Sequence, residues 1–205
     1  MNLEPRGLLR QPPRAAAQQY NSPMFMIRHP APVLLTLLVG AAAAQAWDGG
    51  ADPDAVPDPL RVPDGQVLAL AARGVGVQIY ECSAAKDGAS YFSWSLKGPD
   101  AILRSQSGKR LGKHYAGPTW EADDGSRVTG ELVAKADAPR ASAVPWLLLR
   151  AESVSGTGIF SNVVSIQRLH TVGGTAPAGG CDEAHAGDVS RVRYSAEYRF
   201  YSPES

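Results

Sequence analysis

The densest group of chemically active side chains lies between residues 114 and 126. It contains an imidazole, a phenol, an indole and three carboxyl groups: His114, Tyr115, Trp120, Glu121, Asp123 and Asp124. Gly117-Pro118 predicts a turn that brings His114 and Trp120 face to face across a hairpin. A histidine beside a carboxylate can act as a general base, so His114 with Glu121 or Asp124 is the candidate catalytic group. The alternative is a structural hairpin with Trp120 in the core and solvated acids.

Three side chains are candidates for binding a ligand without reacting with it. If Tyr115 and Trp120 are exposed, their rings offer flat surfaces for a sugar or another small molecule. Arg168 lies in an apolar stretch, where its guanidinium could clamp a carboxylate or another anion. The alternative for Arg168 is a structural hydrogen-bond network shared with its neighbour Gln167.

A metal site would need residues that lie far apart in the chain. His185 follows Asp182 by three residues, and these two with His114 form a candidate site if the fold joins them. The alternative is a set of unrelated surface histidines. The sequence contains no nucleophile elbow, no paired-histidine zinc motif and no phosphate-binding glycine loop, so it predicts no cofactor.

The first 46 residues are typical of a leader that is removed. A positive stretch at residues 26–30 precedes an apolar run at 33–44, and Ala44-Gln45-Ala46 is a small-residue cleavage site. These features predict a secretory signal peptide, and the apolar run is shorter than the roughly 20 residues of a membrane span. The polar stretch before it suggests that Met24 or Met26 is the true start.

Export has consequences for the rest of the chain. Cleavage after Ala46 would leave a protein with no membrane span, in the periplasm or outside the cell. In an oxidising compartment Cys82 and Cys181 are expected to form a disulfide. The leader takes four arginines and one glutamate with it, so 16 basic and 19 acidic side chains remain. This balance offers no basic excess for nucleic acid.

Residues 47–63 are predicted to be an extended linker, because prolines 53, 57, 59 and 63 and the glycines near 50 exclude a helix. From residue 64 to 205 the pattern is that of one β domain. Apolar and polar residues alternate near 75–80, 92–96, 128–134 and, most clearly, 191–200. Trp146–Leu149 is a continuous apolar run, which predicts a strand buried on both faces, and residues 160–169 are a further candidate strand. Many short strands with Asp-Gly turns indicate an antiparallel sandwich or barrel.

Six segments resemble a domain family of unknown function found in exported bacterial and fungal proteins. They are Gly76–Cys82, His114–Glu121 with Asp124–Ser126, Pro145–Leu149, Ile166–Arg168 with Thr171–Gly174, Ala176–Pro177 with Gly180–Asp182, and Tyr194–Tyr201. The resemblance implies no established activity. Some fungal members carry the label malate dehydrogenase, which this sequence does not support. Gly74-Val-Gly76 lacks the third glycine of a dinucleotide fingerprint, with Ile79 in its place, and no βαβ alternation follows.

The leading hypothesis is an exported, non-enzymatic binding or interaction module for a small molecule or glycan. It would use a concave β surface near His114, Trp120 and Arg168. The first alternative is a secreted hydrolase that uses His114 with Glu121 or Asp124. The second is an envelope structural or stress-related protein without a ligand. The sequence assigns no oligomeric state.

Overall fold

The computed structural model describes residues 55–85 and 91–205. The signal peptide, its cleavage site, the alternative starts and residues 47–54 of the expected linker lie outside the described residues. In the described part, no helix is long and apolar enough to cross a membrane.

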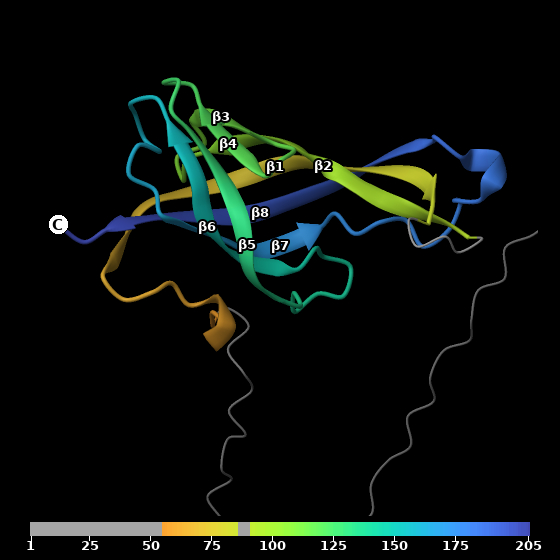
Figure 1. Ribbon diagram of the computed structural model, residues 1–205, viewed down its shortest axis with the longest axis horizontal. Coiled ribbons are helices and arrows are strands. Elements are labelled where there is room, and N and C mark those ends of the chain that lie inside the picture. Colours follow the sequence, from red (N-terminus) through yellow and green to blue (C-terminus); the bar gives the residue numbers. More distant parts are fainter. Residues whose placement is uncertain (1–54, 86–90) are drawn as a thin grey trace, which may run out of the picture. The chain divides into compact units, whose positions relative to one another are not determined.

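Eight antiparallel strands form one sheet that closes on itself. Each strand pairs with the next along the chain, and the first pairs with the last, which makes a closed barrel. The all-β prediction is confirmed, and of the two architectures left open the structure is the barrel (Figure 1). The strands are β1 (Gln66–Ala84), β2 (Phe92–Arg104), β3 (Arg110–Tyr115), β4 (Thr119–Ala122), β5 (Arg127–Ala136), β6 (Trp146–Ser155), β7 (Ser165–Gly173) and β8 (Val189–Pro203).

Side-chain alternation decides what fills the barrel. Along β8, Tyr194, Ala196, Tyr198 and Phe200 are buried, while the residues between them are more exposed. This is the period of two expected when one face of a strand looks inward. An eight-stranded barrel is just wide enough for side chains to fill its interior. Here the largest fully buried side chains are Trp120, Phe160, Tyr198 and Phe200, all within one core cluster.

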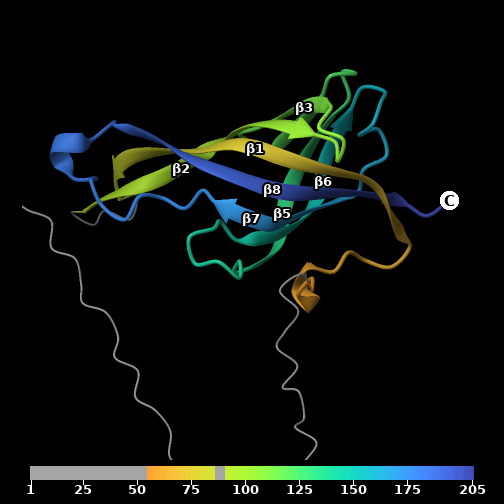
Figure 2. The same cartoon turned by 180° about the vertical axis from the view of Figure 1, so that it is seen from behind.

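A second, smaller core lies on the outer surface of the barrel. Residues 55–63, here called the strap, contain a short 3-10 turn, η1 (Asp58–Leu60), drawn in orange in Figure 2. This turn contacts β5 and β6. Leu60 of the strap is fully buried against Trp146, Leu148 and Leu169. The strap explains why Trp146–Leu149 is apolar throughout: Leu149 points into the barrel, whereas Trp146 and Leu148 lie beneath the strap. The chain therefore packs on the barrel before residue 64.

Gln167 fixes the strap through hydrogen bonds. Its amide nitrogen donates to the Leu60 carbonyl at 2.6 Å, and its amide oxygen accepts from the Tyr201 hydroxyl at 2.7 Å. Gln167 is buried, and both the nitrogen and the oxygen of its side-chain amide have hydrogen-bond partners. The burial of this polar side chain is therefore compensated, and its hydrogen bond to Leu60 holds the strap in place.

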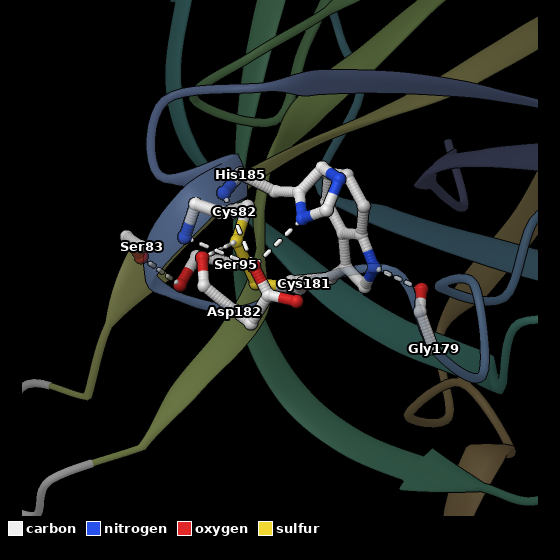
Figure 3. The surroundings of a disulfide bond; sticks show 9 residues. Cys82, Ser83, Ser95, Gly179, Cys181, Asp182 and His185 are labelled. Atoms are coloured by element: carbon white, nitrogen blue, oxygen red, sulfur yellow. Dashed lines mark hydrogen bonds and ion pairs between the residues drawn. A yellow bond between two sulfur atoms is a disulfide. The ribbon is translucent and has the colours of Figure 1, made fainter.

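β1, β2 and β8 extend past the other strands as a ribbon (Figure 1). The disulfide lies near the ribbon tip, since Cys82 is two residues from the end of β1. Cys82 of β1 is bonded to Cys181, with 5.4 Å between the Cα atoms (Figure 3). This confirms the expected pairing. The segment before β8 is also held by a hydrogen bond from the Trp94 indole to the Gly179 carbonyl at 2.9 Å.

One expected strand is shifted along the chain. Residues 160–169 were predicted as a strand, but the strand is β7 and begins at Ser165. Phe160 belongs to the preceding turn and is nevertheless fully buried in the barrel core. Its apolar character therefore reflects packing at the barrel end and not a place in the ladder.

Candidate functional site

His114 lies inside the barrel and is not accessible to a substrate. Only 2% of its surface is exposed, and its ring stacks on Trp120 with 4.4 Å between ring centroids. Nδ1 lies 2.8 Å from the Thr119 carbonyl oxygen, and because a carbonyl can only accept, Nδ1 carries the proton. Burial lowers the His114 pKa to about 3, with a smaller lowering from the charge of Arg168, against the Thr119 hydrogen bond that raises it. The ring is therefore neutral at ordinary pH.

Glu121 lies on the opposite side of the sheet from His114. In the β3–β4 ladder His114 pairs with Trp120, so the next residue, Glu121, points outward. Its carboxylate accepts a hydrogen bond from the Tyr115 hydroxyl at 2.7 Å and forms an ion pair with Lys113 at 3.2 Å. These hydrogen bonds, from Tyr115 first and Lys113 second, lower the Glu121 pKa. The structure therefore brings Tyr115 and Glu121 together but keeps both away from His114.

Asp124 organises the turn between β4 and β5. Its carboxylate accepts from the backbone nitrogen of Ser126 at 2.9 Å, from the Ser126 hydroxyl at 2.6 Å and from the Ile159 nitrogen at 2.8 Å. The Ser126 hydrogen bonds are the main cause of a lowered Asp124 pKa. With these partners Asp124 holds the turn against Ile159, and it does not orient His114.

Arg168, like Trp120 a predicted ligand-binding residue, shares the barrel interior with His114. It pairs with Tyr198 in the β7–β8 ladder, and Nε and Nη2 donate to the Pro145 carbonyl at 3.1 and 2.8 Å. Trp120 is 1% exposed. The concave surface expected from these residues is therefore filled, and Arg168 acts as a brace between β7 and the start of β6.

The second group of predicted residues lies at the ribbon tip. His185 Nδ1 is 2.6 Å from Asp182 Oδ1, and this contact raises the His185 pKa and lowers that of Asp182 (Figure 3). Asp182 also caps the 3-10 turn η2 (Glu183–His185) by accepting from the Ala184 and His185 nitrogens. His114 is not part of this group. In the described part of the chain, no three His, Cys, Asp or Glu side chains are grouped so that they could hold a metal ion.

A cleft that the sequence did not predict lies on the outside of the barrel, over β1, β7 and β8. Its volume is about 410 Å³, and we call it the His170 cleft. It is lined by Ala71, Ala72, Arg73, Ser105, Gln106, His170, Val172, Ser195, Ala196 and Glu197. The turn between β2 and β3 contributes Ser105 and Gln106. Four separate parts of the chain therefore contribute polar groups to one hollow.

A bulge in β7 positions His170 in the cleft. β7 pairs with β8 at Leu169 and again at Val172, and the register shifts between them. His170 adopts a φ of 48°, and it is the one non-glycine residue with positive φ in the described part of the chain. Its Nε2 lies 3.9 Å from a Glu197 oxygen, and its ring packs edge-on against Trp146 at 5.0 Å. Such backbone geometry is uncommon and persists where surrounding contacts hold it.

Cross-strand register sets the chemistry around His170. Arg73 of β1 lies directly opposite Glu197 of β8, and Ser195 lies opposite Val172. Glu197 also receives a hydrogen bond from Arg199 at 2.5 Å. The cleft thus presents a carboxylate, a guanidinium, an imidazole and hydroxyl groups close together, beside small apolar side chains. No spacing motif could have revealed this, because the residues come from different strands and only the barrel register unites them.

Comparison with models of known protein families identifies the family of this chain. Residues 63–202 match the model of the family described as "Protein of unknown function (DUF3455)". This match covers more than half of the chain, so the protein belongs to that family. No match was found among curated proteins or among solved structures.

Proposed function

We propose that this member of the family is a non-enzymatic binding module, and that it holds a small polar molecule or a glycan in the His170 cleft. The observation that carries the proposal is the convergence of Arg73, His170, Ser195 and Glu197 on one hollow of about 410 Å³. Small-molecule sites are typically concave, with volumes of about 300–1,000 Å³ and a few converging polar groups.

The lining of the cleft suits a ligand rich in hydroxyl groups. Glu197 accepts hydrogen bonds and Arg73 donates them, while serine hydroxyls and the Gln106 amide can do both. Ala71 and Val172 provide apolar surface beside these groups. A sugar has the same combination, since hydroxyl groups surround faces made of C–H groups.

A location outside the cytoplasm is also part of the proposal. The disulfide between Cys82 and Cys181 is compatible with an oxidising compartment. A periplasmic or extracellular protein meets free sugars and glycans there.

The hydrolase alternative receives no support from the geometry, because His114 is buried away from Glu121 and Asp124. The envelope-structural alternative would be favoured by a surface with no pocket, and the His170 cleft is a pocket. The binding module is therefore the function we put to the test.

The test is a titration of the ¹⁵N-labelled protein with glucose, galactose, glucuronate and galacturonate, followed by amide chemical shifts. We expect at least one of these probes to shift the amides of His170, Ser195 and Glu197 in a saturable way. Glu197→Gln should weaken the binding of a neutral probe, glucose or galactose, because the cleft then loses its charged acceptor for sugar hydroxyls. His185→Gln at the ribbon tip is the matched control and should change nothing. If no probe shifts the cleft amides at millimolar concentration, the proposal fails.

A further inference from the structure

A second hollow continues the His170 cleft along the barrel wall. It has a volume of about 510 Å³ and is lined by Arg73, Val75, Gly76, Val77, Val172, Gly173, Arg193, Tyr194 and Ser195. Arg73, Val172 and Ser195 line both hollows. The two hollows are therefore adjacent on β7, β8 and β1, and together we call them the extended groove.

Two guanidinium groups, those of Arg73 and Arg193, line the extended groove. Arg191 and Arg199 of β8 form ion pairs with Asp100 at 2.6 Å and Glu197 at 2.5 Å. Arg73 and Arg193, which line the groove, form no ion pair with any residue of the described ranges 55–85 and 91–205. Both are thus available to an anionic ligand, and arginine binds carboxylates in a planar, two-pronged geometry.

The ladder register gives the spacing between the two cations. Arg73 lies opposite Glu197, and Glu197 is four residues along β8 from Arg193. At about 3.3 Å per residue, their backbone positions are separated by roughly 13 Å along the strands. A chain with acidic groups repeated along it can contact both guanidinium groups at once without drawing the two side chains together.

The floor between the two arginines is partly apolar. Val75 is 43% exposed and Val172 is 46% exposed, and Val77 lines the floor beside Arg193. Ser195 lies between the valines, opposite both Val75 and Val172. A serine hydroxyl and two valine side chains therefore form a row across the strands between the two arginines, and a sugar ring could use both kinds of surface.

We propose that the extended groove binds an acidic oligosaccharide, with carboxylates at Arg73 and Arg193 and sugar rings over the valines between them. This inference rests on the proposed function and names its ligand class. Glu197 does not oppose an acidic ligand there, because the Arg199 guanidinium forms an ion pair with the same carboxylate. Polar side chains lie beside the valines in both hollows, which suits a sugar chain better than the continuous apolar surface that a fatty acyl chain would require.

The experiment compares chain length and charge. Calorimetric titration of the whole domain would use galacturonate, tetragalacturonate and the neutral maltotetraose, each at low and high salt. We expect tetragalacturonate to bind at least about tenfold more tightly than the monomer, because a second charged contact forms. Added salt should weaken its binding. Maltotetraose should bind more weakly than tetragalacturonate.

Two variants separate the groove from the cleft. Arg193→Gln should reduce tetragalacturonate affinity about tenfold and leave galacturonate affinity unchanged, because the monomer stays in the His170 cleft. Arg191→Gln on the same strand is the matched control and should change neither affinity, since Arg191 pairs with Asp100.

The outcomes distinguish the two proposals. If the monomer binds the cleft but the tetramer binds no more tightly, or if Arg193→Gln has no effect, the oligosaccharide inference is overturned and the proposed function stands. If maltotetraose binds as well as tetragalacturonate, the acidic character of the ligand is overturned. If no sugar or sugar acid binds the wild-type protein, the proposed function fails and this inference fails with it.

Discussion

Leu60→Ala should destabilise the whole domain, because the strap is packed as part of the fold. Leu60 is fully buried against Trp146, Leu148 and Leu169. Replacing leucine by alanine removes three carbon atoms, which at about 0.8 kcal/mol each gives roughly 2.4 kcal/mol of lost transfer free energy. A residual cavity adds to this loss, as in other buried leucine-to-alanine changes. Because the strap itself can partly collapse into the space, we expect a loss of about 3 kcal/mol.

The assay is equilibrium unfolding in guanidinium chloride, followed by tryptophan fluorescence. Trp146 lies in the same cluster as Leu60, so its emission reports the strap directly. Leu68→Ala makes the same chemical change at a side chain that is 51% exposed, and we expect an effect within about 0.5 kcal/mol. The reasoning is refuted if Leu60→Ala is as mild as Leu68→Ala, since the strap would then contribute nothing to the stability of the barrel.

Three other changes test the interior, the disulfide and the strand contacts. Replacing Cys82 and Cys181 together by alanine should lower the free energy of unfolding by up to about 4–5 kcal/mol, measured by chemical denaturation, because the crosslink closes a loop of 99 residues; an unchanged midpoint would contradict this. The His114 pKa is lowered from 6.5 to about 3 in the folded state. Between these two values the unfolded chain binds a proton that the folded protein does not bind. The free energy of unfolding should therefore be unaffected by this group above about pH 6.5 and fall by up to about 1.4 kcal/mol per pH unit towards pH 3. A His114→Gln variant should show a shallower fall over that range, and equal slopes would disprove the assignment. Gly76→Ala should strongly destabilise the β1–β2 ladder, because the new Cβ would lie 2.1 Å from the Asp100 carbonyl oxygen. The control is Gly179→Ala, whose Cβ would meet nothing within 4 Å. Thermal melts should show a lower midpoint for Gly76→Ala and no change for Gly179→Ala.

The local sequence pattern predicted most of the strands, but the residues of the candidate site were not sorted by the face of the sheet on which they lie. The alternation in β8 correctly identified the inward residues, because a strand with one buried face leaves a period of two. The same rule places Glu121 opposite to His114, so two residues close in sequence could not form one site. The disulfide was predictable from two cysteines and an expected oxidising environment, and the structure contains it.

The His170 cleft could not be predicted from sequence, because it depends on barrel closure. Arg73 and Glu197 lie more than a hundred residues apart in the chain and become neighbours when β1 pairs with β8. His170 gave no signal of its own, since its position depends on a bulge that only the β7–β8 register reveals. The strap was likewise hidden, because prolines that exclude a helix are equally compatible with a free linker and with a segment packed on a sheet.

Closure of the ring through β1 and β8 has a consequence for the order of folding. Hairpins between neighbouring strands can form from local chain, but the last seam joins Gln66 to Pro203 and must wait until nearly all of the domain is available. Such long-range pairing slows folding, because the entropy of a large loop is lost before its contacts form. Until that moment β1 and β8 are open edges that can pair with another chain. The completed seam removes those edges, so the seam that makes folding slow also protects the finished domain from aggregation.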